Sequence, residues 1–88
     1  MEFVRIPISE SGARDLDVYV GTQFLGVGVE YGVPHLFCLM DRNRAPSSRV
    51  VWVYRTGDTV SYPQKKTHVG TFELEDEHYH VFTDLDRR

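Results

Sequence analysis

Two segments of this 88-residue chain, Pro34–Met40 and Arg49–Tyr54, are built to carry apolar side chains on both faces of a β-strand. Neighbouring side chains in a strand point to opposite sides, so a strand that is apolar throughout has two apolar faces. A chain of this length builds only one hydrophobic core. The second apolar face therefore needs a further cover, which a folded-over sheet, another copy of the protein or a ligand would provide.

The first segment shows the pattern most clearly. Leu36, Cys38 and Met40 fall on one side of the strand, and Phe37 and Leu39 fall on the other. Oligomerisation is a common way for a small domain to bury such a surplus face. We therefore expect the protein to form a homo-oligomer.

Strand signals also dominate the rest of the chain, and no window of eleven or more residues has apolar positions at helical spacing. Turn residues separate short alternating segments every eight to twelve positions, which is typical of an antiparallel sandwich or small barrel. We expect one all-β domain over residues 1–88, with six to seven short strands, little or no helix and a frayed tail at 84–88. The expected strands are Glu2–Ile8, Asp15–Val20, Phe24–Tyr31, His35–Met40, Arg49–Arg55, Thr67–Leu74 and His78–Thr83, with a looser segment over Thr59–Gln64.

Charge and cysteine usage narrow the function classes. The net charge of −3 argues against general nucleic-acid binding, which needs a basic surface. The single cysteine, Cys38, lies in an apolar strand, and we expect it to be a small buried apolar residue. The sequence shows no signal region and no apolar run of membrane-spanning length, so we expect a cytoplasmic protein without a membrane partner.

The densest cluster of positive, hydrogen-bond-donating side chains lies in the polar loop expected between Asp41 and Ser48. Arginine forks beside serine hydroxyls suit phosphate oxygens. The alternative is a solvated hairpin loop whose arginines pair with Asp41 or neighbouring acids. Aromatic side chains beside arginine could stack a base, although Trp52 is expected in the core. The candidate ligand-binding residues are Arg42, Arg44, Ser47, Ser48, Arg49, Tyr54 and Tyr79.

Catalytic and metal-binding groupings are weak. His78 and His80 share one face of a strand, but a zinc site needs three or four ligands, and His35 and His68 would complete one only if the fold brought them together. Two surface histidines without a metal are the favoured interpretation. The chain has no nucleophile elbow, phosphate-binding loop or His-x-x-x-His pair. We expect no enzyme, no catalytic residue and no cofactor.

A set of short stretches along the chain forms a recognisable pattern: Glu2-Phe3 with Ile6-Pro7, Phe24 to Val27, Gly32 to Pro34, Leu36-Phe37, Leu39 to Asp41, Tyr54 to Gly57, His68 to Leu74 and His80 to Phe82. The most specific of them is Val-Gly-Thr-Phe-Glu-Leu, from Val69 to Leu74. With these stretches the chain resembles a family of small uncharacterised proteins encoded by phages and prophages, in which tryptophan usually stands at the position of Phe37. The resemblance implies a phage accessory protein in the cytoplasm of an infected bacterium, and it supplies no established activity.

The function expected from these features is non-enzymatic: a homo-oligomer that captures a small anionic ligand, such as a cyclic-nucleotide immune signal, as an anti-defence sponge. Pockets between subunits would let a short chain build a site of ligand size. The alternatives are a module that binds a host or phage protein, or a minor structural or assembly protein of the phage particle. A metal-dependent hydrolase using His78 and His80 comes last.

Overall fold

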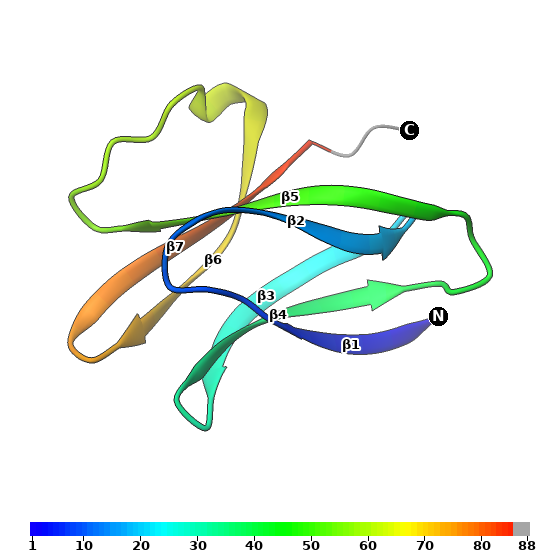
Figure 1. The fold of residues 1–88 in the computed structure, drawn as a ribbon, viewed down its shortest axis with the longest axis horizontal. Coiled ribbons are helices and arrows are strands. Elements are labelled where there is room, and N and C mark those ends of the chain that lie inside the picture. Colours follow the sequence, from blue (N-terminus) through cyan, green and yellow to red (C-terminus); the bar gives the residue numbers. More distant parts are fainter. Residues whose placement is uncertain (86–88) are drawn as a thin grey trace.

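The computed structural model describes residues 1–85 and has two antiparallel sheets that pack on one another (Figure 1). One sheet has the strand order β1-β4-β3, and the other has the order β2-β5-β7-β6. The prediction of an all-β sandwich or small barrel with little or no helix is confirmed, and of the two alternatives the structure is the sandwich. The helix content of the described chain is one 3-10 turn. The elements are β1 (Glu2–Pro7), β2 (Gly12–Tyr19), β3 (Gln23–Glu30), β4 (Val33–Met40), β5 (Pro46–Arg55), the turn η1 (Pro63–Lys65), β6 (Lys66–Leu74) and β7 (Glu77–Asp84).

The central strand β4 has the two apolar faces that its sequence predicts. Leu36 and Cys38 are 0% exposed and Met40 is 4% exposed, because these side chains point between the sheets. Phe37 and Leu39 point to the opposite side and are only half-buried. The chain itself therefore covers one face of β4 and leaves the other at the surface.

Strand β5 repeats this arrangement in the second sheet. Val51 and Val53 are buried in the core, whereas Trp52 and Tyr54 point outward and are half-buried. Trp52 was expected in the core, and that expectation is wrong because strand alternation turns its side chain away from the other sheet. The Lys66 ammonium lies 4.5 Å from the centroid of the Trp52 ring and partly covers it.

Two boundaries differ from the sequence expectations. β5 begins at Pro46 and not at Arg49, because residues 46–48 pair with the end of β2. Thr59–Gln64 contains no strand, since Tyr62 adopts a left-handed φ of 52° and Pro63, which has no N–H, opens the 3-10 turn. Of the expected frayed tail, Asp84 ends β7, while residues 86–88 lie outside the described residues.

Two glycines allow close contacts, one within a sheet and one between the two sheets. A Cβ on Gly28 would lie 3.1 Å from the Phe37 ring, which therefore rests over β3 on the outward side of its sheet. A Cβ on Gly70 would lie 3.1 Å from Cγ2 of Val27, so β6 and β3 meet here across the two sheets. The register of β3 also shifts between Phe24 and Gly26, where the strand has a bulge.

Burial of Cys38 makes the stability of the fold depend on pH. Burial raises the pKa of the Cys38 thiol from 9.0 to about 11. The folded state then holds the thiol proton more tightly than the unfolded state. The contribution of this group to the free energy of unfolding is therefore complete below pH 9 and is lost as the pH rises toward 11. The loss reaches about 2 kcal/mol at about pH 10.5.

Urea unfolding at about pH 8 and about pH 10.5 measures this loss. The comparison is with Cys38→Ala, which has no thiol to titrate and therefore isolates the contribution of this group. Wild type is expected to lose about 2 kcal/mol more than the variant over this interval. Equal losses would show that Cys38 titrates alike in the folded and unfolded states.

Candidate functional site

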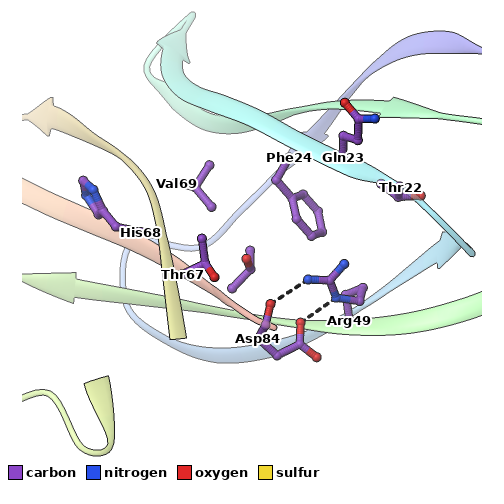
Figure 2. A pocket seen from close by; sticks show the side chains of 9 residues that line it. Thr22, Gln23, Phe24, Arg49, Thr67, His68, Val69 and Asp84 are labelled. Atoms are coloured by element: carbon purple, nitrogen blue, oxygen red, sulfur yellow. Dashed lines mark hydrogen bonds and ion pairs between the residues drawn. The ribbon is translucent and has the colours of Figure 1, made fainter. Parts of the chain in front are cut away.

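A polar pocket of about 260 Å³ opens between the two sheets, where the start of β3 faces β5, β6 and β7 (Figure 2). We call it the Arg49 pocket. Gln23 and Phe24 line it from β3, and Thr67 and His68 line it from β6. The Thr67 hydroxyl and the Phe24 ring face the space between the sheets, whereas the side chains of Gln23 and His68 stand at its rim and are directed away from it. A hydroxyl beside an aromatic ring suits a polar ligand with a planar part.

Arg49 crosses the floor of this pocket in a half-buried ion pair. Its Nε and Nη2 donate to Oδ1 and to the backbone carbonyl of Asp84, each at 2.6 Å. The guanidinium carbon lies 5.0 Å from the centroid of the Phe24 ring. Figure 2 shows the ring above the Arg49 side chain. The side chains of Arg49 and Asp84 are 11% and 20% exposed, so water screens the pair only in part.

The charge on Arg49 is therefore balanced within the protein. A ligand phosphate that bound directly to Arg49 would compete with the Asp84 carboxylate for the same donors. The pocket in its present geometry is suited to the uncharged part of a ligand. Its hydrogen-bonding groups and the Phe24 ring line the space, and the ion pair closes one side.

A second hollow adjoins the Arg49 pocket and shares Gln23 with it. This hollow, which we call the Arg44 hollow, has a volume of about 400 Å³ and is lined by Met1, Val20, Gly21, Gln23 and Arg44. Within residues 1–85, Arg44 takes part in no ion pair. Its guanidinium can therefore bind an anion without first breaking an internal pair.

Local hydrogen bonds position the loop that carries Arg44. The Asp41 side chain accepts from the backbone N–H of Asn43 at 3.0 Å, and the Asp41 carbonyl accepts from the N–H of Arg44 at 3.1 Å. The loop is tied to the end of β2 by the N–H of Val20, which donates to the carbonyl of Ala45 at 2.9 Å. Asp41 thus shapes this turn through backbone contacts and leaves the Arg44 side chain available.

The structure separates the other candidate residues of the loop and of β5. Arg42 is paired with Glu2 on β1. Ser47 is half-buried opposite Val18, and Ser48 lies exposed opposite Asp17. These side chains do not line the Arg44 hollow or the Arg49 pocket.

The two candidate tyrosines, Tyr54 on β5 and Tyr79 on β7, lie near Arg55, at the end of β5 away from Arg49. Tyr54 faces outward and packs edge-on against Phe82, with the ring centroids 5.8 Å apart. Tyr79 is 8% exposed and stacks on Phe72 at 4.9 Å inside the sandwich. Neither ring shares a pocket with Arg44 or Arg49 within one copy of the chain.

The histidine pair lies on the outward side of β7. His78 is opposite Glu73 on β6, and Nε2 of His80 lies 2.7 Å from the Thr56 hydroxyl oxygen. His35 is on the other sheet, and His68 packs against Phe82. Among residues 1–85, the fold brings together no group of three potential metal ligands.

The same residues contain no helix with the length and apolar character that a membrane-spanning helix needs.

Several residues that line the Arg49 pocket were not among the sequence candidates. Gln23, Phe24, His68 and Asp84 come from three strands that meet only in the folded sandwich. Asp84 stands 35 positions from Arg49, and no short motif links them. The one local signal was Gln23-Phe24, where an amide and an aromatic ring directly follow a glycine turn at the entrance of a strand.

Comparisons with known proteins place the chain in a family without assigning it an activity. No curated protein and no solved structure matches the chain significantly. A family model described as "Domain of unknown function (DUF7352)" matches residues 2–88, nearly the whole sequence, and the chain therefore belongs to this family.

Proposed function

We propose that the protein is a non-enzymatic, homo-oligomeric binding protein that captures a small anionic ligand of the cyclic-nucleotide kind. In this proposal it acts as a phage accessory protein in the bacterial cytoplasm and sequesters an immune signal. The observation that carries the proposal is the Arg44 hollow, which has the volume of a ligand site and adjoins the polar Arg49 pocket.

The two hollows would divide the ligand between them. Arg44 supplies a planar fork for phosphate oxygens, and no internal acid of the described chain neutralises it. The Arg49 pocket takes the less charged part of the ligand, for which the Phe24 ring offers a stacking surface and Thr67 offers hydrogen bonds. Gln23 lies between the two parts because it lines both hollows.

Replacing Arg44 with alanine is expected to weaken nucleotide binding about 10- to 100-fold. This is the loss of affinity that follows from losing a hydrogen bond to a charged group. Isothermal calorimetry and thermal shift against a panel of cyclic mono- and dinucleotides measure the change. Arg55→Ala is the matched control, because this exposed arginine lies at the opposite end of β5 from Arg49. It is expected to bind like wild type.

Two results would contradict the proposal. One is wild-type protein that gives neither heat nor a thermal shift with any member of the panel. The other is an equal loss of affinity in Arg44→Ala and Arg55→Ala, which would reduce the effect to overall charge.

A protein-interaction module is the second candidate, and the exposed apolar residues of the β1-β4-β3 sheet favour it. Phe3 is 79% exposed and Tyr31 is fully exposed. This function predicts a stoichiometric complex with a host or phage protein in a pull-down, formed equally well with and without nucleotide. Such a complex, together with an absence of nucleotide binding, would favour this candidate over ligand capture.

A further inference from the structure

Exposed apolar side chains concentrate on one sheet. Of the eight large apolar side chains that are exposed in the described chain, six belong to the β1-β4-β3 sheet, to its hairpin or to the residue before β1. On the outward side of this sheet, Phe3 stands opposite the half-buried Leu39, and the Phe37 ring lies over Gly28. We call this side the Phe3 face. The six exposed residues of the sheet and its surroundings are Met1, Phe3, Leu25, Val29, Tyr31 and Val33. Val29 pairs with Pro34, which is buried in phase with Leu36, so Val29 lies on the inward side and is not part of the Phe3 face.

The charges of the Phe3 face balance one another. Arg5 on β1 pairs with Glu30 on β3. The outward side of the other sheet carries Asp15 and Asp17 on β2 and Glu73 on β6, together with Lys66 over Trp52, in a protein with a net charge of −3. Two copies that met through the four-stranded sheet would bring these carboxylates together, whereas two Phe3 faces meet without like-charge repulsion.

A protrusion and an open space lie at the two edges of the Phe3 face. Phe3 projects from β1 and is 79% exposed. On β3, a Cβ added to Gly26 would meet no atom within 4 Å, and Gly26 pairs with the outward-facing Phe37. A two-fold axis parallel to the central strand β4 exchanges the positions of β1 and β3 and keeps each level along the strands. Phe3 and Gln23 both pair with Leu39, so this axis would bring Phe3 of each copy over the start of β3 of the other copy, two levels of the register from Gly26.

We propose that the Phe3 face is the interface of a two-fold symmetric homodimer in which Phe3 of each copy packs over the start of β3 of the second copy. Such an isologous contact uses the same patch twice and closes on itself. The inference rests on the self-association that the proposed function includes, but it does not depend on which ligand is bound.

Sedimentation velocity over a wide concentration range tests the interface. Wild type is expected to be dimeric, and Phe3→Asp is expected to weaken the dimer about 100-fold or more, because it would bury two unpaired carboxylates. Tyr62→Asp is the matched control. This aromatic residue is 66% exposed and lies outside the sheet, next to η1, so the variant should remain dimeric.

Gly26→Leu provides a second variant that does not add charge. Its side chain would occupy the open space on β3, where the single copy offers no contact, and is expected to weaken the dimer while the monomer stays folded. Thermal midpoints and circular dichroism of each variant establish that the single copies are intact.

The outcomes separate the interface from the rest of the account. A wild-type dimer that persists in Phe3→Asp and dissociates in Trp52→Asp overturns the Phe3 face and leaves ligand capture untouched. A wild type that is monomeric throughout overturns the dimer and leaves the face to a different partner. Calorimetry on Phe3→Asp shows separately whether a single copy binds nucleotide.

Discussion

Replacing Leu36 with alanine is expected to lower the free energy of unfolding by about 3–4 kcal/mol. Leu36 is 0% exposed and lies in the central strand β4, between Ile6 on β1 and Val27 on β3. The substitution removes three buried carbon atoms and leaves a cavity that strands paired on both sides cannot easily close. Because a domain of this size is stable by only about 4–13 kcal/mol, the variant should approach the limit of folding.

Urea denaturation of the two proteins measures the loss. Leu25→Ala is the control, since it is the same substitution at a leucine that is 50% exposed at the β3 bulge, and it should cost less than about 1 kcal/mol. Similar losses in both variants would mean that β4 is not the centre of the core.

Replacing Gly70 with valine is expected to cost about 2–3 kcal/mol. A Cβ at this position would lie 3.1 Å from Cγ2 and 3.6 Å from the backbone nitrogen of Val27, and the two valine methyl groups need more room still. The backbone atom cannot move without shifting β3. The substitution should therefore push the two sheets apart at the edge where β6 meets β3.

Gly26→Val is the matched control for this prediction. It places the same side chain on a strand glycine whose Cβ would meet nothing within 4 Å. Its free energy of unfolding should therefore stay within about 0.5 kcal/mol of wild type. Chemical denaturation of both variants, followed at protein concentrations below dimer formation, makes the comparison. An unchanged midpoint for Gly70→Val would show that the sheets are not in close contact there.

Alternation alone predicted most of the fold. The inward and outward sets of β4 follow directly from Leu36, Phe37 and their neighbours, because strand geometry leaves no other arrangement. Alternation also placed Trp52 and Val53 on opposite sides of β5, but it could not tell which side would meet the other sheet. That choice depends on how the sheets stack, and for Trp52 the interpretation was wrong.

Elements without a strong pattern were less predictable. Pro46, Ser47 and Ser48 have the composition of a loop, yet β2 extends far enough to pair with them. Tyr62 and Pro63 look compatible with a short strand end until the backbone enters the 3-10 turn. In both places a tertiary partner or a local backbone preference outweighed composition.

The candidate site was predictable only in part. The loop arginines were visible as a group, but their separation was not, because Arg42 is drawn to Glu2 and Arg49 to Asp84 across long stretches of sequence. The pocket between the sheets arises from residues that no motif connects. Sequence could identify Arg44 as a candidate, and only the fold places it beside Gln23.

The most direct test of the whole account is native mass spectrometry of the protein after expression in bacteria that contain candidate nucleotide signals. It reports the number of subunits and any retained small molecule in one spectrum. The account predicts a dimer that carries a small anionic ligand, and it predicts that Arg44→Ala leaves the dimer but loses the ligand. A bare, single-subunit species under the same conditions would contradict it.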